Sequence, residues 1–150
     1  MKKIISSLML GAALSTSAGV VLADAAQDAI EYRRAVFQLV KWNFAPMGDM
    51  VKGKTEFDAE RFEVLAQRLA ALSEMPLEGF SVEGSDKGDT KARAEIWSQW
   101  DDFAAGMQQF EKNAQELASV ASSGDLEQIK PAFAAVGKTC KGCHDNFKDK

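Results

Sequence analysis

The sequence predicts an all-α protein folded as an antiparallel four-helix bundle. Along four separate segments, apolar residues recur at steps of three and four, as they do on one face of an α-helix. No stretch shows the alternating pattern or the Asn-Gly and Asp-Gly turns that strands and hairpins need. Since none of these helices is stable alone, a bundle that buries all four apolar faces together is the economical solution.

The first two helices are indicated before residue 74. The first has its stripe at positions 30, 33, 37, 40, 44 and 47, and Pro46 indicates a kink or an end nearby. The second is expected to begin near Asp58, a favourable N-cap residue. Its apolar face consists of Phe62, Leu65, Leu69 and Leu72. Pro76 and three glycines then predict a loop over about 74–90.

Two longer helices follow the loop. The third is expected over 91–121, and the run Ser-Ser-Gly-Asp ends it. Asp125 is expected to cap the fourth helix, which continues nearly to residue 150 through a local bend at Pro131. The fourth helix carries Ile129, Phe133, Val136, Cys140, Cys143, His144 and Phe147 on one face.

Residues 1–23 are expected to be a secretory signal peptide. Lys2 and Lys3 precede an apolar stretch, and the small-residue ending places the cut between Ala23 and Asp24. Several serine and threonine residues and two glycines interrupt the stretch, which disfavours a retained membrane anchor. The mature protein is therefore expected to be one periplasmic domain over 24–150, with no membrane attachment after cleavage.

The charge of the mature domain disfavours a role in nucleic-acid binding. Removing Lys2 and Lys3 from the 18 basic residues leaves 16 against 22 acidic residues, a formal charge of −6. A protein that binds the phosphate backbone usually carries the opposite excess.

Both cysteines and the only histidine lie together in the fourth helix. Cys140, Cys143 and His144 stand at i, i+3 and i+4, so all three project from about a third of the helix circumference. This is the Cys-x-x-Cys-His pattern of c-type haem attachment. Two thiols one turn apart can add to the two vinyl groups of a haem, and the adjacent imidazole can serve as an axial ligand of the iron.

Three other chemistries compete for this pattern. A redox Cys-x-x-Cys usually follows a strand and opens a helix, whereas this pair comes late in one. A zinc site needs a fourth ligand, here an unspecified carboxylate. A disulfide closing so small a loop would contribute little stability and gives His144 no role. Haem attachment, with one covalent haem c per chain, is the favoured interpretation.

The sixth position of the iron has few candidate ligands. The single histidine excludes bis-histidine ligation within one chain, and every methionine lies before the motif. The methionines to consider are Met47, Met50, Met75 and Met107, although methionine more often fills gaps in a core.

With this motif at the end of a four-helix pattern, the sequence resembles cytochrome c′, the class II c-type cytochromes. The segments that carry the resemblance are EYRRAVFQLV, ALSEMPLEGF, AEIWSQWDDF and VGKTCKGCHDNFK, which span essentially the whole mature chain. The four-helix bundle is the general architecture of that family.

The resemblance implies roles for six residues. Cys140 and Cys143 would hold the haem by thioether bonds, and His144 would be the proximal ligand. In the family an arginine next to a haem propionate precedes an apolar residue on the distal face by four positions. Those positions are Arg33 and Phe37 in this sequence. Many members have an arginine four residues after the histidine, where this chain has Lys148, which lacks the planar fork of donors.

Ordinary structural roles remain open for some of these residues. Phe37 also fits a core position, and Arg33 and Arg34 fit a solvated helix face.

Low-spin relatives place a methionine at or near the Phe37 position, so the resemblance implies a five-coordinate, largely high-spin iron here.

Two functions from different classes follow. The first is the binding of a small neutral gas, nitric oxide or carbon monoxide, in an apolar pocket over the iron. The second is electron transfer by a six-coordinate haem, with Lys138, Lys141, Lys148 and Lys150 guiding a periplasmic redox partner. Lysines near a helix C-terminus are favourable anyway, which gives this cluster an equally plain structural explanation.

No general acid or base is evident beside the motif, so an enzymatic role is not expected. The resemblance also implies a homodimer, because class II relatives commonly pair through their first two helices.

Overall fold

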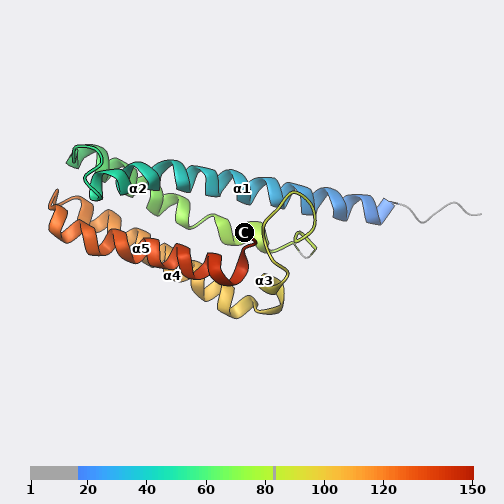
Figure 1. Cartoon of the computed structure of the whole chain (residues 1–150). Coiled ribbons are helices and arrows are strands. Elements are labelled where there is room, and N and C mark those ends of the chain that lie inside the picture. The colour runs from blue at the N-terminus through green and yellow to red at the C-terminus, as the bar shows by residue number, and fades with distance from the viewer. Residues whose placement is uncertain (1–16, 83) are drawn as a thin grey trace, which may run out of the picture.

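The predicted helical bundle is the fold of the chain. A computed structural model describes residues 17–82 and 84–150. It contains α1 (Ser17–Val51), α2 (Ala59–Ser73), the 3₁₀-helix η1 (Pro76–Phe80), α3 (Glu95–Ser98), α4 (Trp100–Ala121) and α5 (Leu126–Phe147). Figure 1 shows the four long helices packed side by side, with α1 extending beyond the others at its N-terminal end.

Only part of the expected signal peptide lies within the described residues. Most of the expected signal peptide, residues 1–16, lies outside the described residues, while Ser17–Ala23 form the first turns of α1. Cleavage after Ala23 stays a prediction, and it would shorten α1 from its N-terminus. Among the described residues, no helix combines the length and the apolar character that crossing a membrane requires.

The predicted caps of α2 and α5 are confirmed. The Asp58 carboxylate accepts a bond of 2.9 Å from the backbone N–H of Arg61, and Asp125 accepts one of 2.9 Å from that of Glu127. Each bond satisfies a helix N–H that has no partner within its own helix. Gly124 before Asp125 has φ +66°, a conformation that glycine adopts without strain. Asp58 and Asp125 thus mark where α2 and α5 begin.

The two prolines do not end their helices. Pro46 lies within α1, which continues to Val51, and Pro131 lies within α5, which continues to Phe147. The prediction of a kink or an end near Pro46 agrees with the end of α1 at Val51, five residues later.

The third helix differs from the prediction of one helix over 91–121. It is divided into α3 and α4 at Gln99, whose φ of −124° and ψ of 45° are not helical. Before α3, the chain is extended, because Ala92 forms an antiparallel bridge with Lys148. The backbone polar groups of this segment are thus bonded to the C-terminal residues, which prevents a helix from starting at Lys91.

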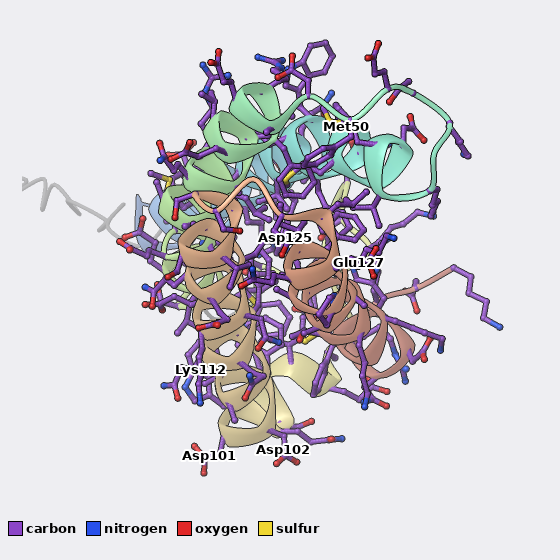
Figure 2. The ribbon with its side chains drawn as sticks, turned by 90° about the vertical axis from the view of Figure 1, so that its left-hand side faces the viewer. Met50, Asp101, Asp102, Lys112, Asp125 and Glu127 are labelled. Atoms are coloured by element: carbon purple, nitrogen blue, oxygen red, sulfur yellow. The ribbon has the colours of Figure 1, made fainter. Side chains whose placement is uncertain are left out.

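The core follows the predicted stripes. Its fully buried members include Met47, Phe62, Leu65, Leu69, Ile96, Ala114, Leu117, Ile129 and Val136. The bundle has two dissimilar ends. The "capped end" is where α1 leads into α2 and α4 into α5; Figure 2 looks at it and shows Met50 at the end of α1 and Asp125 and Glu127 at the start of α5. The "motif end" holds Arg33, Phe37, residues 90–95 and Cys140–Lys148.

Candidate functional site

The Cys-x-x-Cys-His motif occupies the last turns of α5. Cys140 and Cys143 are half-buried free thiols, and His144 is exposed. Cys140 packs against the core, whereas Cys143 lies against α4. The helix therefore presents the two sulfur atoms toward the protein and keeps the imidazole accessible.

Gly106 of α4 makes room for Cys143. A Cβ atom placed on Gly106 would lie only 2.9 Å from Cys143 Sγ, closer than such atoms approach in real structures. Any other residue at this position would push the sulfur away from α4. Glycine in the middle of a helix costs roughly 1 kcal/mol relative to alanine, so this close approach explains a residue that lowers local helix stability.

Burial of the motif favours the neutral form of both thiols and of the imidazole. Burial raises the pKa of Cys140, with a smaller contribution from Cys143, and burial likewise raises the pKa of Cys143. The pKa of His144 is lowered by desolvation and by the charge of Lys148, against the opposing effect of Asp145. Both thiols stay protonated and the imidazole stays neutral, with a lone pair available to a metal.

The same observations disfavour the competing chemistries. A thiol of a redox pair needs a lowered pKa, and both cysteines show the opposite. The two thiols are free in the structure, without a disulfide. Within residues 17–82 and 84–150, no group of three or more His, Cys, Asp or Glu side chains is arranged to hold a metal ion. A zinc ion, unlike a haem iron, would depend on such a group.

Contacts at the capped end fix the register between α1 and α5. The rings of Phe44 and Phe133 stack with centroids 4.3 Å apart. A Cβ atom on Gly48 would lie 3.3 Å from the Phe133 ring, and one on Gly137 would lie 3.9 Å from the Phe44 ring. Phe44 thus lies level with Gly137, and Gly48 with Phe133, as antiparallel helices require.

This register places Phe37 level with His144. Phe37 stands seven residues before Phe44 on α1, and His144 stands seven residues after Gly137 on α5. Each residue advances a helix by about 1.5 Å, so both positions lie roughly 10 Å from the Phe44 level. Two residues far apart in the sequence are therefore brought to the same height in the bundle.

Aromatic contacts continue from Phe37 across the bundle. Its half-buried ring lies 6.3 Å from that of Phe80, which lies 4.7 Å from Phe103. Phe103 in turn lies 5.3 Å from Phe147, three residues after His144. Trp97 and Trp100 flank this series, with centroids 6.3 Å from Phe80 and 6.0 Å from Phe103. Phe37 therefore belongs to a continuous apolar cluster that reaches the end of α5.

Arg33 holds the loop that follows η1. Its side chain is only 2% exposed. It donates to Gly79 O at 3.2 Å, to Ser85 Oγ at 2.8 Å, to Thr90 Oγ1 at 3.0 Å and also to Ser85 O. Four of its five N–H groups are thus engaged, which leaves only Nε–H for another acceptor. Its guanidinium also lies 4.7 Å from the Phe80 ring centroid.

Of the two roles open to Arg33, the solvated helix face is excluded by its burial. Arg34 does lie on an exposed face, where it pairs with Asp89. Lys148 is exposed and lies just beyond α5, where its backbone pairs with Ala92. Its charge contributes to the lowered pKa of His144, so it acts at the imidazole.

Two surface hollows border the aromatic cluster. One, of about 450 Å³, is lined by residues 97–102, and the other, of about 370 Å³, is lined by Phe80, Ser81, Trp97 and Trp100. Figure 2 shows Asp101 and Asp102 at the start of α4, pointing away from the bundle.

Several residues of the site carried no sequence signal. Ser85 and Thr90 lie in a loop, and their role depends on a buried arginine 52 and 57 positions earlier. Gly106 was the one detectable exception, because a glycine within an apolar helical stripe indicates a close approach.

Comparison with known proteins gives one consistent family. The family described as Cytochrome C′ matches residues 28–148. Cytochrome c′ of Halomonas halodenitrificans is 38% identical over 127 residues, covering 81% of this chain and 96% of its own.

Two solved structures show the same fold. Cytochrome c prime of Shewanella frigidimarina is 53% identical with a TM-score of 0.81, covering 83% of this chain and 97% of its own. A ferrous arginine-to-lysine variant of cytochrome c prime from Alcaligenes xylosoxidans with bound NO is 37% identical, with a TM-score of 0.76 and coverage of 83% and 96%. The fold, the two neutral thiols one turn apart and these similarities together show that this chain belongs to the cytochrome c′ family, whose members bind haem c covalently.

Proposed function

We propose that this chain is a periplasmic c-type haem protein that binds a small neutral gas, nitric oxide in particular, at a five-coordinate, high-spin iron. The observation that carries this proposal is the register of α1 and α5, which brings Phe37 level with His144. With haem c bound to His144, the Phe37 ring would be in a position to cover the side of the iron where a sixth ligand binds.

The proposal gives each residue of the motif a role. Cys140 and Cys143 would form the thioether bonds, and His144, whose pKa is lowered by desolvation and by Lys148, would provide the proximal nitrogen. The remaining N–H of Arg33 would be available to a haem propionate, and the charge of Lys148 favours the neutral form of the imidazole. When bound, haem c supplies an iron with one open position for a diatomic gas.

Ligand selection would follow from the surroundings of Phe37. Aromatic rings offer neither a strong hydrogen-bond donor nor a charge, so they favour small neutral molecules over anions and water. The Alcaligenes xylosoxidans relative has NO bound. These rings also neither accept nor release protons, so we assign no enzymatic step to the site.

The positions of the methionines support an open iron position. By the same register, Met47 lies level with position 134, ten residues or about 15 Å from His144, and Met50 lies farther still. Met75 lies just before η1 and is 41% exposed, and its carbonyl oxygen accepts a bond of 3.5 Å from the Tyr32 hydroxyl.

The visible absorption spectrum of the holoprotein tests this function. We expect broad high-spin bands in the ferric and dithionite-reduced states, which shift when carbon monoxide or nitric oxide is added. Sharp low-spin bands with a methionine-to-iron charge-transfer feature, unresponsive to either gas, would contradict the proposal.

One observation favours the second candidate, a six-coordinate electron carrier. The contact of Gly106 with Cys143 places the buried Met107 level with the motif. Exposed Lys138 and Lys148 lie close to the motif in sequence and could guide an anionic partner. Replacing Met107 with leucine, which conserves volume, separates the two functions. The spectrum stays unchanged if Met107 is core, and low-spin features disappear if Met107 is a ligand.

A homodimer through α1 and α2 is the second part of the proposal. Trp42 is 73% exposed and Leu39 is 50% exposed, one turn apart on α1. The contact of Tyr32 with Met75 sets the antiparallel register of α1 and α2, which brings Val64 of α2, 40% exposed, alongside them. An exposed apolar patch of this kind is typical of a protein interface. Sedimentation should show a dimer that Trp42→Lys converts to a monomer; a dimer unaffected by this change would place the interface elsewhere.

A further inference from the structure

The last residues of the chain are fastened to the segment before α3. Phe147 O accepts a bond of 3.1 Å from the N–H of Arg93, and Lys91 O accepts one of 2.9 Å from the N–H of Asp149. These two bonds flank the isolated antiparallel bridge between Ala92 and Lys148. Figure 1 shows the C-terminus beside this segment.

Arg93 makes the side-chain contacts of this junction. Its Nη1 donates to Asn146 O at 3.0 Å, its Nη2 donates to the Glu95 carboxylate, and its Nε lies 3.9 Å from Asp149 Oδ1. Asn146 O belongs to the last turn of α5, whose carbonyls lack partners within the helix. The arginine therefore contacts the end of α5 on one side and the start of α3 on the other.

The Glu95 carboxylate is kept ionised, as its contact with the Arg93 guanidinium requires. Its pKa is lowered first by its own backbone N–H and then by Arg93. An ionised Glu95 fixes one edge of the guanidinium fork, which directs the opposite edge at Asn146.

The same segment is fastened to α1. Thr90 Oγ1 accepts bonds from Arg33 Nη2 at 3.0 Å and from the N–H of Ala92 at 3.1 Å. Within four consecutive residues, the chain thus contacts the buried arginine of α1 and the residues after His144. The end of α5 is therefore connected to α1 through the segment 90–93.

We propose that Arg93 is a positioning residue that sets the orientation of His144 and Lys148 by fixing Asn146–Asp149 against the segment 90–95. The part concerning the imidazole rests on the proposed role of His144 as the proximal ligand. The part concerning the C-terminus rests on the contacts alone.

If Arg93 formed only its surface ion pair with Glu95, its removal would have little effect on the C-terminus. Exposed pairs contribute little to stability, and the Arg93 side chain is 34% exposed. The bond to Asn146 O does not depend on a second charge, however, and it is formed at a helix terminus. The distinction is therefore measurable as local order at the C-terminus rather than as global stability.

The experiment compares holoprotein variants Arg93→Ala and Arg93→Lys with Lys91→Ala as the matched control. Lys91 is an exposed cation two residues away whose part in the junction is made by its backbone, which alanine retains. Each variant is treated with carboxypeptidase Y, and the loss of C-terminal residues is followed by the mass of the intact protein. Resonance Raman spectra of the ferrous, gas-free proteins report the iron–histidine stretching band.

Arg93→Ala should release residues 147–150 about fivefold to tenfold faster, as expected for the loss of a hydrogen bond from a charged donor. Its iron–histidine band should broaden or shift, Arg93→Lys should be intermediate, and Lys91→Ala should match the wild type. Equal digestion rates in all four proteins would overturn the proposal. Faster digestion of Arg93→Ala with an unchanged band would overturn the positioning of His144. A wild-type protein without any iron–histidine band would instead contradict the proposed five-coordinate state.

Discussion

The capped end and the motif end of the bundle are built by different kinds of contact. At the capped end, α1 meets α5 directly through the stacked rings of Phe44 and Phe133. At the motif end, the described contacts run from Phe37 by way of Phe80 and Phe103 to Phe147. Direct packing sets the register at one end, and that register aligns the residues of the other. Stability and function are thus separated along the length of α1, which can be tested by changes at each end.

The largest effect is expected from Phe133→Ala at the capped end. Phe133 is 8% exposed and contacts both Phe44 and Phe62. Loss of a buried phenyl ring should lower the free energy of unfolding by about 3–5 kcal/mol, measured by urea denaturation. The high-spin spectrum should stay unchanged, because the change lies two to three turns from the motif. A loss of the high-spin bands in Phe133→Ala would show that the two ends are not separable.

Arg33→Ala should have the next largest effect. The change removes four bonds to the loop after η1 and leaves Ser85, which is fully buried, without its partner. We expect a loss of about 2–3 kcal/mol in the free energy of unfolding, together with faster proteolysis between residues 81 and 90. Arg34→Ala is the matched control, since Arg34 forms an exposed pair with Asp89. Equal effects of the two changes would show that the buried hydrogen bonds of Arg33 contribute no more to stability than an exposed ion pair.

Phe37→Ala sharpens the comparison at the motif end. Removal of the ring should speed carbon monoxide binding to the ferrous protein about tenfold, equivalent to a barrier lower by about 1.4 kcal/mol. Stopped-flow or flash photolysis measures the rate. Phe44→Ala removes the same ring from the same helix at the capped end and should leave the rate unchanged. An unaltered rate in Phe37→Ala would remove this residue from the distal side.

The smallest effect is expected from Asp125→Ala, which removes the N-cap of α5. The loss should be about 1 kcal/mol in the free energy of unfolding by urea denaturation. Gas binding should not change, because the cap lies at the start of the helix and His144 near its end. Glu116→Ala, on the exposed face of α4, is a suitable comparison for the loss of a carboxylate.

Local patterns were sufficient for much of this fold. The apolar stripes predicted all four long helices, and short polar residues predicted the caps at Asp58 and Asp125, because both signals depend on neighbours in sequence. The spacing of Cys140, Cys143 and His144 likewise fixed their common face on α5. The roles of Arg33, Phe37 and Lys148 came from resemblance and remain part of the proposal.

Non-local contacts account for what was missed. Gln99 is a good helix former, yet α3 ends there, where Trp97 donates to Phe80 O at 3.0 Å and Trp100 packs on Phe103. The start of the predicted third helix was wrong because residues 91–93 pair with residues 147–149, more than 50 positions away. The contacts of Arg33 with Ser85 and Thr90 were missed for the same reason, because these residues are 52 and 57 positions away in the sequence. Pairings of this kind leave no periodicity that a single segment could reveal.

The close approach of Gly106 to Cys143 has a consequence for the maturation of the protein. A sulfur atom packed against a neighbouring helix is poorly accessible to a bulky reactant, so early pairing of α4 with α5 closes the attachment site before the bond has formed. We therefore expect the haem to be attached before α4 packs on α5. The glycine that gives the sulfur its place in the folded bundle would then bear on the order of the two events.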